Sequence, residues 1–335
     1  MQTAIQQLLD GVDLDRDSAR GAMHQIMSGE ATDAQIGAFL IALRCKGETV
    51  TEVAGFAEVM REKATRISGG GRTKIDTCGT GGDGSGTFNI STAVAFVAAG
   101  AGLCVAKHGN RAMSSRCGSA DVLLELGVDI EAGPGKVSEC LDEAGIGFLF
   151  APLLHGAMKH AIGPRREIGT RTVFNILGPL TNPAGAKRQL LGVFDAGLTG
   201  KLAGVLQMLG SERAYVVHGS DGLDEITSTG HSQVTELKDG TLKTFEITPD
   251  CFGFETATAA DLQGGNAADN AAILRSVLEG KPGPARDVVV MNAAAAVAAG
   301  DLAEDLPSGA AVAEESIASG AALAALEKLV EVSNS

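Results

Sequence analysis

Residues 76 to 83 read Asp76-Thr77-Cys78-Gly79-Thr80-Gly81-Gly82-Asp83, a glycine-rich stretch that follows an apolar, strand-like run. A helical segment carrying Asn89, Ser91 and Thr92 comes soon after it. Glycines let backbone N–H groups turn toward a ligand without a Cβ in the way, and a helix N-terminus adds unpaired donors and a dipole that favours anions. The stretch therefore predicts a phosphate-binding loop between a strand and a helix.

The spacing of these glycines differs from that of two common phosphate loops. The Walker loop ends in Gly-Lys-Ser or Gly-Lys-Thr, and the dinucleotide loop has three spaced glycines followed by an acid that binds ribose. Neither pattern is present at residues 76 to 92. We therefore expect a different phosphate ligand.

The region that follows the loop contains no acidic residue. The chain carries 41 Asp plus Glu against 27 Lys plus Arg, for a net charge of -14, yet residues 84 to 120 lack both acids. This window includes Lys107, His108, Asn110, Arg111 and Arg116. An acid-free segment in an acidic protein predicts a locally positive site for a highly charged small ligand.

The N-terminal region is predicted to form a small helical bundle. Apolar residues within 36 to 43 and 53 to 60 recur at helical spacing. Capping boxes at Thr32 with Gln35 and at Thr49 with Glu52 start the two helices, and Gly47 ends the first. Both stripes are apolar enough to require burial against other helices. The run of three glycines at residues 69 to 71 then predicts a hinge.

Beyond the hinge, short β-rich runs alternate with helical segments, which predicts a mainly parallel sheet covered on both faces. The pair of runs separated by Asp239-Gly240 predicts instead an antiparallel hairpin, at residues 233–237 and 242–247. The expected parallel strands lie at residues 74–77, 103–106, 148–150, 190–194, 214–218 and 287–291.

Size and composition indicate a globular protein large enough for two domains. With 335 residues, 44% hydrophobic and 20% charged, the chain can bury a large core. No apolar run is long enough to span a bilayer and no signal peptide is recognisable, so a cytoplasmic location without membrane contact is expected. The six cysteines form no C-x-x-C pair or zinc spacing and are expected to be reduced thiols, while His155 and His160 are expected to be structural.

Three long segments resemble the anthranilate phosphoribosyltransferase family. They are residues 76 to 128, residues 165 to 183 and residues 217 to 225, which occur in the family's order, and the likeness runs nearly end to end. The resemblance implies an α/β fold with a small N-terminal helical domain and a large α/β domain that has a mainly parallel central sheet, similar to nucleoside phosphorylases and phosphoribosyltransferases. It implies domains at 1–70, joined by returning helices near 153–177, and at 71–335.

The same resemblance implies an activity in tryptophan biosynthesis. The phosphoribosyl group of phosphoribosyl pyrophosphate would be transferred to the amine of anthranilate, giving N-(5-phosphoribosyl)anthranilate and pyrophosphate. The implied partners are these two small substrates and a second copy of the chain, bound through the helical domain, with no nucleic acid. Ser91, Asp224 and Glu225 map onto the family's metal ligands, for two Mg²⁺ ions per monomer.

The remaining site residues follow from the same mapping. Gly79, Asn110 and Arg165 correspond to the family's anthranilate contacts, although Gly163-Pro164-Arg165 shifts a proline that the family has two residues before this arginine. No side chain is assigned a certain catalytic role, and His108 is a candidate acceptor for the amine proton. The implied donor-binding residues are Gly79, Gly82, Asp83, Thr87, Asn89, Ile90, Ser91, Thr92, Lys107, His108, Gly109, Asn110, Arg111, Ala112, Met113, Ser114, Ser115 and Ser119.

The sequence leaves two alternative functions open. Pyrimidine nucleoside phosphorylases share the architecture and bind inorganic phosphate, but their glycine loop resembles Lys-His-Ser-Thr-Gly-Gly, unlike residues 76 to 82 here. A non-enzymatic homologue that binds nucleic acid would need a basic surface and a damaged donor site. The isoelectric point near 4.9 and the complete motifs both disfavour it.

Overall fold

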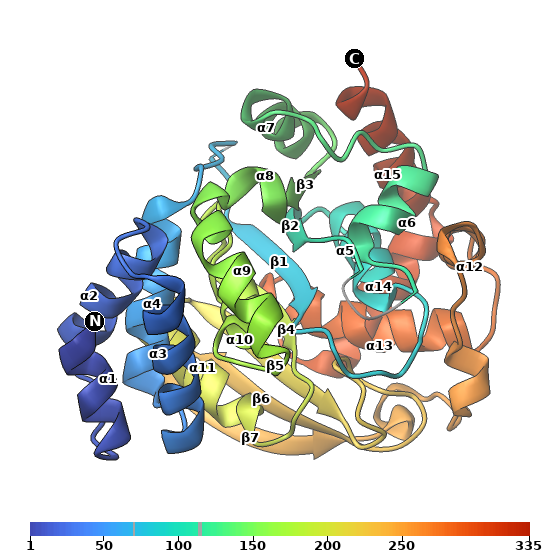
Figure 1. The fold of residues 1–335 in the computed structure, drawn as a ribbon. Coiled ribbons are helices and arrows are strands. Elements are labelled where there is room, and N and C mark those ends of the chain that lie inside the picture. The colour runs from blue at the N-terminus through green and yellow to red at the C-terminus, as the bar shows by residue number, and fades with distance from the viewer. Residues whose placement is uncertain (70, 113–115) are drawn as a thin grey trace.

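The computed structural model describes residues 1–69, 71–112 and 116–335. Four helices form the N-terminal bundle: α1 (Gln2–Leu9), α2 (Arg16–Met27), α3 (Asp33–Lys46) and α4 (Val50–Lys63). The capping boxes of Thr32 with Gln35 and of Thr49 with Glu52 are both confirmed, and Gly47 ends α3 with a φ of 89°. Helix α9 (Lys159–Ile168) lies against α3 and α2, so a later part of the chain returns to this bundle (Figure 1).

A seven-stranded sheet occupies the centre of the molecule (Figure 1). Its order is β3-β2-β1-β4-β5-β6-β7; the first five strands pair in parallel, and β6 pairs antiparallel with both β5 and β7. The hairpin turns through Asp239 and Gly240, both at positive φ as a tight turn requires. The strands are β1 (Lys74–Gly79), β2 (Cys104–Gly109), β3 (Ile146–Phe150), β4 (Arg188–Gly192), β5 (Arg213–Gly219), β6 (Ser232–Lys238) and β7 (Thr241–Ile247).

Helices cover both faces of this sheet, as an α/β fold requires. On one side α5, α13, α14 and α15 pack together, and on the other α11 packs against α4, β5 and β6. The remaining helices are α5 (Ile90–Gly100), α6 (Ser119–Glu125), α7 (Pro134–Glu143), α8 (Ala151–Leu154), α10 (Phe174–Leu177), α11 (Leu198–Met208), α12 (Ala267–Leu278), α13 (Pro284–Ala299), α14 (Leu306–Ala318) and α15 (Ala321–Ser333), with short 3-10 turns at Gly156–Met158, Gly178–Leu180, Pro249–Phe252 and Ala259–Leu262.

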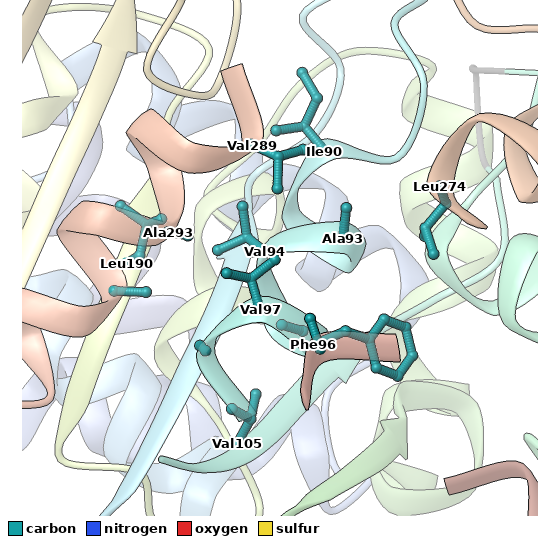
Figure 2. Close-up of a cluster of buried hydrophobic side chains, with 14 of the residues drawn as sticks. Ile90, Ala93, Val94, Phe96, Val97, Val105, Leu190, Leu274, Val289 and Ala293 are labelled. Carbon is teal, nitrogen blue, oxygen red and sulfur yellow. The ribbon is translucent and has the colours of Figure 1, made fainter. Parts of the chain in front are cut away.

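Alternate residues of the strands face the two sides of the sheet. Leu190 and Tyr215 belong to the core around α5 and α13, whereas their neighbours Leu191 and Val216 belong to the core beneath α11 and the bundle. Figure 2 shows the first of these cores, where Val94 and Val97 of α5 meet Leu190, Val289 and Ala293. The strands are therefore buried on both faces, which explains their continuous apolar sequences.

One predicted strand is wrong. Residues 287–291 lie inside α13, which begins at Pro284 and runs to Ala299. Val288, Val289, Val290 and Met291 are fully buried because α13 has neighbours on several sides, so the run lacks the one-sided apolar stripe of a surface helix. A short apolar run of this kind has no period that distinguishes a strand from a buried helix. The other predicted strands are confirmed, with ends that shift by a few residues.

Candidate active site

The glycine-rich loop begins where β1 ends, beside the end of β4. Gly79 and Gly192 are paired across these two strands, and both leave room for Asp224. A Cβ on Gly79 would lie 2.3 Å from Asp224 Oδ2, and one on Gly192 would lie 1.5 Å from the Asp224 carbonyl oxygen. Any larger residue at either position would collide with Asp224. The glycines therefore admit the turn after β5 into the carboxyl ends of the parallel strands, where α/β proteins bind ligands.

The Asp224-Glu225 pair accepts hydrogen bonds from backbone N–H groups of the glycine-rich loop and of the start of α5. Gly81 N donates to Asp224 Oδ2 at 2.7 Å, and Ser91 N donates to Glu225 Oε1 at 3.1 Å. These contacts join parts of the chain that are 143 and 134 residues apart. The fold therefore brings the three residues expected to bind metal, Ser91, Asp224 and Glu225, to one place.

Both acids of the pair resist ionisation. Burial, followed by the charge of Asp83, raises the pKa of Asp224 to about 7. Burial, followed by the charge of Asp224, raises the pKa of Glu225 to about 8. The sequence indicated a role for the backbone of Asp83 but not for its carboxylate, which adds to this repulsion. Such a crowded set of acids favours a divalent cation, which would relieve the repulsion.

These oxygens suit Mg²⁺. The ion prefers carboxylate, hydroxyl and phosphate oxygens, and it usually takes only one or two carboxylates from the protein and completes its shell with water and substrate phosphate. Two adjacent carboxylates with a serine hydroxyl nearby are a donor set of that kind. In the described part of the chain, no group of three or more His, Cys, Asp and Glu side chains is arranged to hold a metal.

Lys107 is buried directly beside this acidic pair. Its side chain leaves β2, and Nζ donates to the Thr77 carbonyl at 2.6 Å and lies 3.5 Å from Ser91 Oγ. Burial lowers the pKa of Lys107, and the charges of Asp76 and Glu225 oppose that effect. The residue is 2% exposed, so it is not a lysine of a solvated loop. It places a positive charge between the strand ends and the start of α5.

The N-terminus of α5 presents the predicted polar residues at the same edge of the sheet. Ile90 is its first residue and Asn89 its N-cap. The Thr92 hydroxyl is buried and, within the described residues, has no hydrogen-bond partner. Asn89 instead bridges two other segments, donating to the Cys117 carbonyl at 3.2 Å and accepting from Asn270 at 3.0 Å. An unsatisfied hydroxyl at a helix N-terminus suits an anionic ligand.

The second predicted phosphate loop follows β2. Ser119 Oγ lies 3.3 Å from the Asn110 backbone nitrogen, and it occupies the space that a Cβ on Gly109 would need. Arg111 lies over the Phe150 ring and pairs with Asp121, whose carboxylate also accepts from Ala112 N at 3.0 Å. Thr87 pairs with Gln263 in an isolated bridge. Three predicted residues, Met113, Ser114 and Ser115, lie outside the described residues.

Arg165 projects from α9 and, in the described ranges, forms no ion pair with a carboxylate. Its guanidinium lies 5.0 Å from the centre of the Phe174 ring, and burial lowers its pKa. Pro164 is accommodated inside α9, which continues to Ile168 and ends at Gly169 in the left-handed conformation. The shifted proline therefore does not break the helix that carries Arg165. A half-buried guanidinium of this kind suits a carboxylate ligand.

His108 lies against a second histidine that the sequence did not connect to it. The Nε2 atoms of His108 and His155 are 3.2 Å apart, and both rings are buried. Burial, followed by the charge of His155, lowers the pKa of His108 to about 3, and burial lowers that of His155 to about 4. An imidazole with so low a pKa is a weak proton acceptor at neutral pH, which weakens the candidate role of His108.

The fold and this arrangement of residues define a class of transferase. Residues 2–64 match a glycosyl transferase family, helical bundle domain, and residues 71–323 match a glycosyl transferase family, a/b domain. Within the described residues no helix is long and apolar enough to cross a membrane.

Named relatives narrow this class. An anthranilate phosphoribosyltransferase of Moorella thermoacetica is 58% identical over 330 residues, covering 98% of this chain and 97% of the relative. One of Trichlorobacter lovleyi is 51% identical, with 100% coverage of both chains. The chain belongs to the anthranilate phosphoribosyltransferase family.

Solved structures agree with this assignment. The anthranilate phosphoribosyltransferase of Thermus thermophilus is 43% identical, with a TM-score of 0.94 and 99% coverage of each chain. The Saccharomyces cerevisiae enzyme, solved in complex with PRPP and Mg, is 30% identical, with a TM-score of 0.90 and coverage of 99% of this chain and 97% of that chain.

Proposed function

We propose that this protein is an anthranilate phosphoribosyltransferase. It transfers the phosphoribosyl group of phosphoribosyl pyrophosphate to the amine of anthranilate, releasing pyrophosphate, in tryptophan biosynthesis. The observation that carries the proposal is the placement of the Asp224-Glu225 pair against the glycine-rich loop and the start of α5. The full-length relatives support it over both a nucleoside phosphorylase and a nucleic-acid-binding protein.

Phosphoribosyl pyrophosphate is assigned to the edge of the sheet between the two loops. Yeast anthranilate phosphoribosyltransferase has been solved with this donor and with Mg, which supports the assignment. In the proposal, Lys107 contacts donor phosphate as a point charge, while the amides of the glycine-rich loop, the start of α5 and residues 107–119 complete the cradle. The unpaired Thr92 hydroxyl is one of the donors that would gain a partner.

Ser91, Asp224 and Glu225 are proposed to hold Mg²⁺, two ions per monomer. When bound, the metal neutralises charge that develops on the departing pyrophosphate. The carboxylates must lose their protons to act as ligands, and their raised pKa values mean that metal and protons compete for them near neutral pH.

Anthranilate is assigned to the side of the site that faces α9. In the proposal, Arg165 pairs with its carboxylate, and Asn110 and Gly79 contact the ring and amine. The yeast enzyme in complex with 4-fluoroanthranilate, 29% identical with a TM-score of 0.88, supports a pocket for such a ring. An aryl amine is neutral and nucleophilic at pH 7, so it needs no strong base before it attacks the anomeric carbon.

The reaction then depends mainly on positioning and electrostatics. A bond forms between the amine nitrogen and the anomeric carbon as the bond from that carbon to pyrophosphate oxygen breaks, and the nitrogen loses a proton. The chain's residues hold the amine and the ribose in line and keep water from an oxocarbenium-like transition state. His108, at its low pKa, is assigned no essential part.

The proposal includes assembly, domain organisation and location. Residues 1–70 with the segment near 153–177 form one domain and residues 71–335 the other. Leu9, Val12 and Ile41 on or beside α1 and α3 are exposed apolar side chains, which suits a homodimer contact through the helical domain. All six cysteines are free thiols, which suits the reducing cytoplasm.

An anthranilate fluorescence assay tests the activity. The chain has no Trp and one Tyr, so its own emission interferes little. Loss of anthranilate fluorescence should require both phosphoribosyl pyrophosphate and Mg²⁺ and should match the pyrophosphate released. Donor-independent loss of fluorescence, or phosphorolysis of thymidine or uridine, would contradict the proposal.

A further inference from the structure

Arg171 connects the helical bundle to the glycine-rich loop. It lies between α9 and α10, and its Nη2 donates a hydrogen bond to the carbonyl oxygen of Gly82. Its own carbonyl oxygen accepts a hydrogen bond from Nη1 of Arg44, in the last turn of α3. Arg171 therefore contacts both the bundle and the loop assigned to the donor.

Phe194 supports this contact through its ring. The centre of the ring lies 4.1 Å from the Arg171 guanidinium carbon, within the range of a cation–π contact. The backbone N–H of Phe194 donates to Thr80 Oγ1 at 3.1 Å, so the same residue also holds the first part of the loop. The guanidinium is thus held by this cation–π contact as well as by its hydrogen bond.

Gly82, which accepts the hydrogen bond from Arg171, has a backbone conformation that favours glycine. Its φ is +75°, a conformation that residues with a Cβ rarely adopt, and a Cβ there would be 3.4 Å from Arg171 Nη2. The position therefore favours glycine because of its backbone conformation, whereas the space beside the guanidinium would admit a Cβ.

The planar peptide group lets this contact determine the direction of the Asp83 N–H. The Gly82 carbonyl and the Asp83 N–H belong to one planar trans peptide unit, so they point in opposite directions. Because the carbonyl faces Arg171, the Asp83 N–H faces away from it. Within the described residues this N–H has no acceptor, so it is available to a ligand.

We infer that Arg171 is a positioning residue that aims the Asp83 N–H at a phosphate oxygen of the donor. The inference rests on the proposed function, because it takes the ligand of this loop to be phosphoribosyl pyrophosphate. Arg171 acts through the Gly82 carbonyl and does not itself contact the donor. Without it, the peptide unit between Gly82 and Asp83, flanked by glycines, is free to rotate, and the donor must order it on binding.

Calorimetric titration with phosphoribosyl pyrophosphate and Mg²⁺ tests this role. Arg171→Ala should weaken donor binding about 10-fold or more, the effect of a lost hydrogen bond to a charged group. Arg171→Lys keeps a hydrogen-bond donor of similar reach and should recover part of the affinity. The affinity of Phe194→Leu should lie between those of Arg171→Ala and the wild type. Arg166→Ala is the matched control, since it removes an exposed arginine of α9, and it should change affinity less than about twofold.

Salt dependence separates positioning from direct contact. If Arg171 acts through Gly82, plots of log Kd against log ionic strength for the wild type and for Arg171→Ala should be parallel. A flatter slope for Arg171→Ala would show that the guanidinium contacts donor phosphate itself, which would overturn the inference.

Two further results would also overturn it: an unchanged Kd for Arg171→Ala, or an equal loss for Arg166→Ala. Thermal unfolding of each variant shows whether it is folded, and Arg171→Lys and Phe194→Leu carry the test if Arg171→Ala is not. A wild-type protein that does not bind the donor would refute the proposed function and the inference with it. Donor binding by the wild type that is indifferent to residue 171 would refute the inference alone.

Discussion

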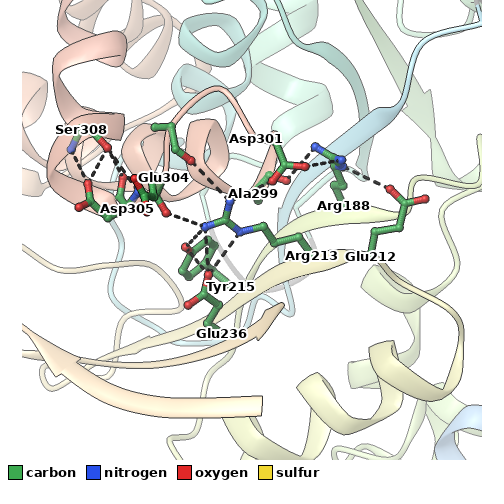
Figure 3. A network of polar contacts seen from close by, with 11 residues as sticks. Arg188, Glu212, Arg213, Tyr215, Glu236, Ala299, Asp301, Glu304, Asp305 and Ser308 are labelled. Carbon is green, nitrogen blue, oxygen red and sulfur yellow. Dashed lines mark hydrogen bonds and ion pairs between the residues drawn. The ribbon is translucent and has the colours of Figure 1, made fainter. Parts of the chain in front are cut away.

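Charged side chains lie at both ends of the central sheet, but the two ends differ in how closely these charges are paired. At the carboxyl ends of the parallel strands, Asp224 and Glu225 lie near Asp83. Lys107 is buried beside this pair but, within the described residues, forms no ion pair with it. At the opposite end, the first residues of β4 and β5 are Arg188 and Arg213, and each faces acidic partners (Figure 3). The first region therefore has acids close to one another, whereas in the second region each arginine has acidic partners.

The paired end is satisfied almost completely. Arg213, whose side chain is 5% exposed, lies 3.1 Å from Glu236 and 3.0 Å from Asp301. It also donates to Tyr215 Oη at 2.9 Å, and Tyr215 in turn donates to Glu236 at 2.7 Å (Figure 3). Burial acts to lower the pKa of Arg213, but its hydrogen bonds with Asp301, Tyr215 and Glu236 raise it overall. This network ties β4, β5 and β6 to the turn after α13.

This difference in charge pairing indicates that one end of the sheet contributes to stability and the other to binding. A buried charge that has its partners contributes to the fold, and removing one partner leaves the other uncompensated. A cluster of like charges destabilises the fold unless a ligand of opposite charge arrives, so its persistence points to binding. The following predictions test whether binding and stability separate between the two ends of the sheet in this way.

The largest effect is expected at the unpaired end. Asp224→Asn combined with Glu225→Gln keeps the shape but removes the charge that holds Mg²⁺, so kcat/KM should fall by about 10³-fold. Excess Mg²⁺ should restore part of it. Asp239→Asn combined with Glu246→Gln, which removes two acids from the hairpin, is the control and should keep normal activity. A double acid variant with more than about a tenth of wild-type activity would show that these carboxylates are not the metal site.

Arg213→Met, at the opposite end of the sheet, should lower stability but leave activity nearly unchanged. It leaves Glu236 without its buried partner, and we expect the free energy of unfolding in urea to fall by about 3 kcal/mol. The kcat/KM of the folded protein should stay within about twofold of the wild-type value. Arg188→Met removes a more exposed charge with more exposed partners and should cost about 1 kcal/mol or less. Loss of activity by the still-folded Arg213→Met variant would mean that the two ends are coupled.

Arg165→Ala tests the cation on the α9 side of the site. It removes the proposed partner of the anthranilate carboxylate but leaves the phosphate cradle, so the KM for anthranilate should rise about 30-fold. Donor affinity, measured by calorimetry, should change less than about twofold because the two substrates have separate contacts. If Arg165→Ala abolished donor binding as completely as the double acid variant, Arg165 would serve a phosphate instead.

The elements of the fold were largely predictable because their signals are local. Capping boxes at Thr32 and Thr49 fixed the starts of two helices, and β-rich runs bounded by glycine located the parallel strands. The run at residues 287–291 was mistaken for a strand because α13 is buried all round, and burial removes the periodicity that identifies a helix. The alanine-rich continuation after Asn292 was the available signal for a helix.

The contacts within the site were less predictable because they join distant segments. The family resemblance implies that Ser91 and Glu225 share a metal site, but no local pattern links Arg171 to Gly82 or His108 to His155. These pairs are separated by 89 and 47 residues, and only the packing of the chain brings them together. The carboxylate of Asp83 was overlooked because the loop around it indicated backbone donors.

The smallest effect concerns the pH dependence of stability without metal. The pKa values of Asp224 and Glu225 are raised to about 7 and about 8 in the folded chain, from 3.8 and 4.5. The folded chain therefore holds protons that the unfolded chain has lost. The contribution of this pair to stability is most favourable at about pH 4 and below, and it falls as the pH rises toward about 8. Burial raises the pKa of Asp76 to about 6, so the contribution of Asp76 to stability is lost at a lower pH than that of the Asp224-Glu225 pair.

In EDTA, the free energy of unfolding of the wild type should fall by about 1 kcal/mol between about pH 6 and about pH 8 as the Asp224-Glu225 pair ionises. The fall is only this large because Asp224 is half-buried and water screens its charge. The variant with Asp224→Asn and Glu225→Gln should lack this fall and should unfold a few degrees above the wild type at about pH 8. Added Mg²⁺ should raise the melting temperature of the wild type but not of the variant. Parallel plots of stability against pH for the two proteins would mean that the Asp224 and Glu225 carboxylates do not repel each other in the folded chain. Charge would then not explain the difference between the two ends of the sheet.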